Sequence, residues 1–112
     1  AYPEITGRRY SASPEDVLKA VDKIVADRKW RIVSHPPLVD GELEYTLEAV
    51  ASTPLLGFPS DIAIRLTDEG ESTYVDMRSA SRYGRDDFGD NARRISDFFG
   101  ALDAEMAAQA NR

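Results

Sequence analysis

Residues 42–51, Glu-Leu-Glu-Tyr-Thr-Leu-Glu-Ala-Val-Ala, decide the fold class of this chain. Apolar and polar side chains alternate along them, which is typical of a strand with one buried and one hydrated face. The side chains that share the predicted inner face are Leu43, Tyr45, Leu47, Ala49 and Ala51. Glu42, Glu44 and Glu48 lie on the other face and indicate contact with water. Two faces of different polarity favour an antiparallel sheet.

Further strands are predicted on both sides of this stretch. Their approximate ranges are 5–10, 30–34, 61–66 and 73–80. Asp68-Glu69-Gly70-Glu71 is a hairpin signal that joins the last two strands, and Asp40-Gly41 is a turn signal before residue 42.

Two helices are predicted, one after the first strand and one at the end of the chain. Ser13 is a capping residue, and Pro14 has the backbone angle that the first helical turn needs, so the first helix covers about 14–28. The second covers about 88–109. Its predicted core stripe is Ala92, Ile95, Phe99, Leu102 and Met106.

The resulting order is β-α-β-β-β-β-α. It predicts a single α+β domain over residues 1–112, with an antiparallel sheet and both helices on one of its faces. This order of elements resembles the TBP-like fold, which the helix-grip ligand-binding domains elaborate by an insertion. Element order carries no function by itself.

Composition excludes several functional classes. The net charge of −6 disfavours general binding to nucleic acid, because phosphate backbones repel an acidic chain. The absence of Cys removes disulfides and thiolate chemistry, and a single His makes a zinc site improbable. No apolar run is long enough to span a membrane. We therefore expect neither a metal nor a cofactor.

One stretch of the sequence is more specific than its element pattern. Residues 57–61 read Gly-Phe-Pro-Ser-Asp, and residues 75–95 read VDMRSASRYGRDDFGDNARRI. These segments resemble the bacterial DUF1499 family, whose pattern is a GFPDD loop followed by VDvRSxSRxGxxDxGxNxxRI. Ser60 stands where the family has its first Asp, and Phe88 stands where Leu is usual.

The resemblance implies no assigned activity. It implies a bacterial, envelope-associated protein, with a membrane or an envelope protein as its partner and an anchor upstream of Ala1.

The motif is rich in charge, and two interpretations of it stay open. Residues 76–97 hold arginines and aspartates in balance, which favours internal ion pairs. In this first interpretation Arg65, Asp76 and Arg78 form a ladder across strands, and Arg82 and Arg94 tie the following loop to the second helix. In the second, a cleft binds a carboxylate or a phosphate. The residues of that candidate anion site are Arg65, Arg78, Arg82 and Arg94.

The other motif residues have predicted structural roles. Ser79 is an inward hydroxyl and Ser81 a loop or capping hydroxyl. Gly84 permits positive φ, and Gly89 lets the second helix approach the sheet closely. The remaining members of this structural set are Asp61, Asp76, Asp87 and Asn91.

No catalytic residue is predicted. His35, the one imidazole, precedes two prolines and is expected in a solvated turn, and no nucleophile motif is present.

Three functional classes follow. The first is a non-catalytic accessory or binding domain. The second is a binder of a small anion or other small ligand, or an enzyme, with an arginine-lined cleft. The third is a module that docks on a protein or membrane through the apolar loop 54–59, which carries Leu55, Leu56 and Phe58. The sequence predicts neither the ligand nor the oligomeric state.

Overall fold

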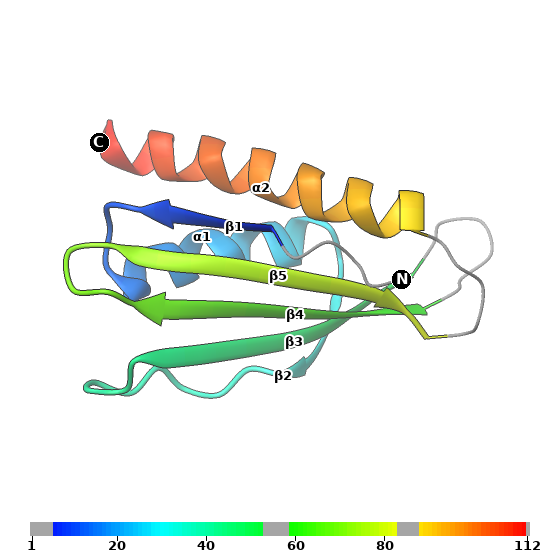
Figure 1. Cartoon of the computed structure of the whole chain (residues 1–112), viewed down its shortest axis with the longest axis horizontal. Coiled ribbons are helices and arrows are strands. Elements are labelled where there is room, and N and C mark those ends of the chain that lie inside the picture. Colours follow the sequence, from blue (N-terminus) through cyan, green and yellow to red (C-terminus); the bar gives the residue numbers. More distant parts are fainter. Residues whose placement is uncertain (1–5, 53–58, 83–87, 112) are drawn as a thin grey trace.

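The computed structural model describes residues 6–52, 59–82 and 88–111, which form one antiparallel sheet with two helices on one face (Figure 1). The elements are β1 (Thr6–Tyr10), α1 (Pro14–Asp27), β2 (Arg31–Ser34), β3 (Glu44–Ser52), β4 (Pro59–Asp68), β5 (Thr73–Ser81) and α2 (Phe88–Ala110). Their order is the predicted β-α-β-β-β-β-α, and the α+β class is confirmed. Within these residues neither helix has the length and apolarity to cross a membrane.

The strands lie in the order β1-β5-β4-β3-β2, so β1 pairs with the last strand and β2 forms the opposite edge. The hairpin between β4 and β5 is confirmed at the predicted turn. Gly70 has a φ of +91°, which favours glycine, and its N–H donates to Asp68 Oδ1 at 2.9 Å. This hairpin fixes the pairing register of β4 and β5, which places Asp61, Arg65 and Asp76 on one face of the sheet.

Helix α1 begins as the sequence predicts. Ser13 Oγ accepts a hydrogen bond from the N–H of Asp16 at 3.2 Å, and Pro14 occupies the first turn. The apolar stripe of α1 is buried against the sheet; its members include Val17, Val21, Ile24 and Val25.

Helix α2 buries a different stripe from the predicted one. Ile95, Phe99 and Leu102 are buried as expected, but Ala92 is exposed. Asn91 and Phe98 are buried instead, at 4% and 0% exposure. The reason is that Asn91 bonds to the sheet and Phe98 stacks on Trp30, with ring centroids 6.1 Å apart. These contacts set the rotation of α2 about its axis.

Two apolar residues of the predicted strands lie near the edge of the sheet. Strand β3 begins at Glu44, so Leu43 falls outside it and is 68% exposed. Ile32 is 42% exposed because β2 is a short edge strand. The core is therefore centred on β3, β4 and β5. Its largest fully buried side chains include Leu47, Ile64, Met77 and Phe99.

Candidate functional site

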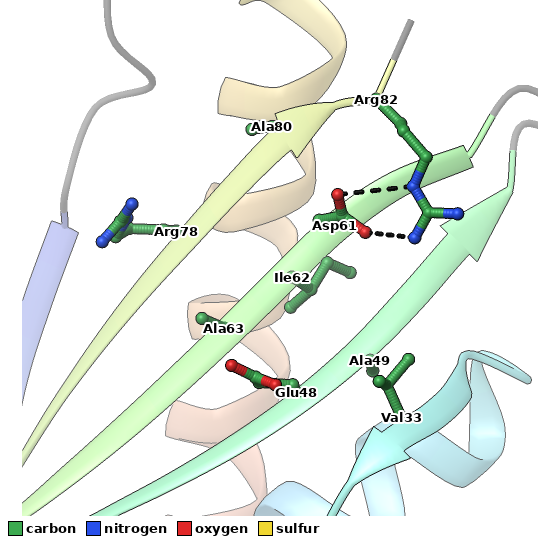
Figure 2. Close-up of a pocket in the computed structure, with 9 residues that line it drawn as sticks. All are labelled: Val33, Glu48, Ala49, Asp61, Ile62, Ala63, Arg78, Ala80 and Arg82. Carbon is green, nitrogen blue, oxygen red and sulfur yellow. Dashed lines mark hydrogen bonds and ion pairs between the residues drawn. The ribbon is translucent and has the colours of Figure 1, made fainter.

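The face of the sheet that the helices leave open carries most of the charged motif residues. In Figure 2 both helices lie behind the sheet, and the labelled side chains project from β2, β3, β4 and β5. A row of cross-strand partners, Glu48, Ala63 and Arg78, runs across three of these strands. The next partners along β4 and β5 are Asp61 and Ala80.

These residues surround a hollow of about 340 Å³. Its lining residues are Val33, Glu48, Ala49, Asp61, Ile62, Ala63, Arg78, Ala80 and Arg82. The hollow exists because Ala63 and Ala80 have short side chains, whereas longer side chains rise around them (Figure 2). A volume of this size is at the lower end of the range for small-molecule sites.

One end of the hollow is closed by an ion pair between β4 and the end of β5. Arg82 Nη2 donates to Asp61 Oδ1 at 2.5 Å, and Arg82 Nε lies 3.4 Å from Asp61 Oδ2. The two side chains are 41% and 57% exposed, so water weakens their attraction. The pair therefore orients Arg82 along the rim and contributes little to stability.

A second pair lies further along the same face. Arg65 and Asp76 are cross-strand partners, and Arg65 Nε donates to Asp76 Oδ2 at 3.0 Å, as the predicted ladder requires. The hydrogen bond from Arg65 and the negative charge of Asp76 raise the pKa of Arg65 above its ordinary value. Arg65 is therefore engaged by Asp76 and does not line the hollow.

Arg78 differs from these two arginines. Within the described residues it makes no ion pair or side-chain hydrogen bond, although it lines the hollow and is exposed. Glu48, two strands away, is likewise exposed without such a partner in the described part of the chain. Figure 2 shows the Glu48 side chain leaning over Ala63 and Arg78 reaching toward β1, so the two charges flank the alanine without meeting.

Arg94, the fourth predicted anion ligand, lies on the helix side of the sheet. Its Nη1 donates to Ser79 Oγ at 3.2 Å and to Asn91 Oδ1 at 2.9 Å. Ser79 Oγ in turn donates to Asn91 Oδ1 at 2.7 Å, and Asn91 Nδ2 donates to Ser81 Oγ at 3.1 Å. We call Ser79, Ser81, Asn91 and Arg94 the inner network. It joins β5 to α2, so the four predicted arginines do not share one cleft.

Of the roles predicted for the glycines and the loops, one is contradicted by the structure and the others fall on residues outside its described part. Gly89 is expected to allow close approach of α2, but a Cβ added there would meet none of the described residues within 4 Å, so the predicted close approach to the sheet is wrong. Gly84 and Asp87, and Leu55, Leu56 and Phe58 of the apolar loop, lie outside the described residues. Among residues 6–52, 59–82 and 88–111, no cluster of three or more His, Cys, Asp or Glu side chains is placed to hold a metal ion.

His35 is the residue that the sequence interpretation missed. It is exposed, as expected, but its ring is also bonded: Nε2 lies 2.8 Å from Asp22 Oδ1 of α1, and Nδ1 lies 3.0 Å from the hydroxyl of Tyr45 on β3. The prolines that follow it suggested an exposed turn. The contact depends instead on how α1 packs against β3, which no local pattern reports.

Comparisons with known proteins found a matching family model and similar solved structures. A family model described as "Protein of unknown function (DUF1499)" matches residues 1–102. The vertebrate conserved region of human METTL16 has a similar structure, with a TM-score of 0.53 and 16% identity over 87% of this chain and 98% of that chain. TTHA0849 from Thermus thermophilus gives a TM-score of 0.40 and 13% identity over 94% and 97% of the two chains. No curated protein matches the sequence. At 16% identity the likeness to the METTL16 region concerns the fold alone.

Proposed function

The chain belongs to the DUF1499 family, a family of unknown function, and from the geometry of its open sheet face we propose that it is a non-catalytic binding domain. Its ligand site is the hollow between β2, β3, β4 and β5, and the ligand carries a carboxylate or phosphate group that Arg78 binds.

Arg78 is the observation that carries this proposal. Of the four arginines predicted to bind an anion, Arg65 is engaged by Asp76, Arg82 by Asp61 and Arg94 by the inner network. Arg78 lines the hollow and makes no ion pair with the described residues. Its guanidinium lies beside the hollow, toward β1 (Figure 2), and offers paired N–H donors that suit a carboxylate or a phosphate.

The other charges around the hollow favour binding over catalysis. The side chains that line it include no Ser, Thr, Cys, Lys or His within the described residues, so these provide no hydroxyl, thiol or amine nucleophile and no imidazole base. Asp61 is held by Arg82, and Glu48 lies across Ala63 from Arg78. The bacterial, envelope-associated role implied by the family resemblance and docking through residues 54–59 both stay predictions.

The test is a thermal-unfolding series with phosphate and with succinate, each compared with sodium chloride at equal ionic strength. A ligand that binds only the folded state stabilises it by ~1.4 kcal/mol at ten times its Kd, which is a shift of several degrees for a chain of this size. We expect at least one anion to raise Tm in the wild type, and Arg78→Gln to abolish that rise.

Arg93→Gln is the matched control, because Arg93 is an exposed arginine of α2 that pairs with Asp90 and does not line the hollow. It removes the same charge and should keep the anion-induced rise. The proposal fails if neither anion raises Tm above the sodium chloride series, or if Arg78→Gln responds as the wild type does.

A further inference from the structure

The side chain of His35 lies between α1 and β3, directly after the end of β2. One ring nitrogen, Nε2, is 2.8 Å from Asp22 Oδ1 on α1. The other, Nδ1, is 3.0 Å from the hydroxyl oxygen of Tyr45 on β3. The imidazole therefore connects the segment after β2 to two different elements of the fold.

The hydrogen bond of Tyr45 fixes which atoms carry protons. Its hydroxyl donates to the carbonyl oxygen of Pro36 at 2.8 Å, and a hydroxyl has only one proton to give. The Tyr45 oxygen therefore presents a lone pair to Nδ1, so Nδ1 must carry a proton to bond with it. Asp22 accepts only, so Nε2 must carry a proton too.

We propose that His35 is doubly protonated in the native fold and acts as a pH-sensitive clasp that fastens the segment 35–43 to α1 and β3. In the imidazolium form all three hydrogen bonds are made at once. In the neutral form with a proton on Nε2, Nδ1 is only an acceptor, so the hydroxyl of Tyr45 can donate either to Nδ1 or to the carbonyl oxygen of Pro36, but not to both. Deprotonation therefore costs the clasp one hydrogen bond.

The surroundings of His35 favour the charged form. Partial burial lowers the pKa of His35, but the hydrogen bond to Asp22 and the charge of that carboxylate outweigh it, and the net direction is upward from 6.5. On the β3 side the facing group is Tyr45, and burial raises the pKa of that phenol, so it stays neutral where His35 titrates. The form with all three hydrogen bonds is thus favoured at low pH, and the clasp loses one of them as the pH rises through the raised pKa of His35.

This inference does not depend on ligand binding at the hollow. An NMR titration can test it without interference from other histidines. His35 is the one histidine, so a ¹³C or ¹⁵N NMR titration of the imidazole gives a single curve. We expect a midpoint above 6.5 and ring ¹⁵N shifts of an imidazolium below it. The amide signals of residues 38–43 should follow the same midpoint.

Asp22→Asn removes the carboxylate and should lower the midpoint, and Tyr45→Phe should uncouple the amides of 38–43 from the titration. Asp27→Asn is the matched control, since Asp27 is an exposed acid of the same helix that makes no contact with His35. It should leave the midpoint in place. A wild-type midpoint at or below 6.5, or one that Asp22→Asn and Asp27→Asn move equally, overturns the proposal.

Discussion

At the scale of the residue, the DUF1499 motif divides between the two faces of the sheet. Strand β5 alternates, so Arg78 and Ala80 face the open side while Ser79 and Ser81 face the helices. Neighbouring residues on a strand point in opposite directions, so the motif contributes side chains to both faces of the sheet. Its open face carries the hollow, and its inner face carries the hydrogen bonds that hold α2.

Asn91 is the centre of the inner network and gives the first prediction at this scale. Asn91→Ala leaves Ser79 and Arg94 without their shared acceptor and Ser81 without its donor, so it should reduce the free energy of unfolding by about 1–3 kcal/mol. Urea unfolding measures the loss. Asn111→Ala, at an exposed residue after α2, should change it by less than about 0.5 kcal/mol. Equal effects at the two sites would show that the inner network does not stabilise the fold.

At the scale of the element, β1 is held to β5 partly by a side chain that covers a glycine. Gly7 of β1 pairs with Asp76 of β5. A Cβ added to Gly7 would lie 1.9 Å from the hydroxyl oxygen of Tyr74, which is a clash. The guanidinium of Arg9 in turn lies over the Tyr74 ring, and its Cζ is 4.8 Å from the ring centroid. An aromatic ring over a strand glycine compensates for the missing side chain.

Gly7 of β1 and Gly100 of α2 should respond to replacement by alanine in opposite directions. Gly7→Ala must displace Tyr74 and should destabilise the fold by about 1 kcal/mol, at the low end for overpacking because a partly exposed ring can move. Gly100→Ala lies in the interior of α2 with nothing within 4 Å of the new Cβ, and should stabilise by ~0.5–1 kcal/mol. Urea unfolding of both variants measures the changes. A stabilising Gly7→Ala would mean that Tyr74 does not pack over β1.

Local patterns predicted the elements better than they predicted the contacts between elements. The predicted bounds of α1 agree with the structure to within one residue and those of β3 to within two. Alternation and capping succeed here because both depend only on residues that are close in the sequence. The burial of Phe98 in place of Ala92 depends on Trp30 and on the inner network, which come from elsewhere in the sequence.

The candidate site was predictable in part for the same reason. The pairing of Arg65 with Asp76 follows from the hairpin register, whereas the placement of Arg94 on the helix side depends on the rotation of α2. The contact between His35 and Asp22 needs the three-dimensional placement of α1.

At the scale of the whole molecule, the sheet separates the side that the helices cover from the side that we propose binds a ligand. The two helices (Figure 1) and the inner network lie on one face, and the hollow with Arg78 opens on the other (Figure 2). The central claim is that two arginines of one motif, Arg78 and Arg94, differ in purpose because they lie on opposite faces. A variant of the first should affect binding, and a variant of the second should affect stability.

The free energies of unfolding of Arg78→Met and Arg94→Met, measured side by side in urea without added anion, test this claim most directly. Both replacements remove one positive charge and keep a long aliphatic side chain. Arg94→Met should lose about 1–2 kcal/mol, because the inner network loses a charged donor, and Arg78→Met should stay within about 0.5 kcal/mol of the wild type. Equal losses in the two variants, or a larger loss for Arg78→Met, would contradict the division of the motif between the two faces.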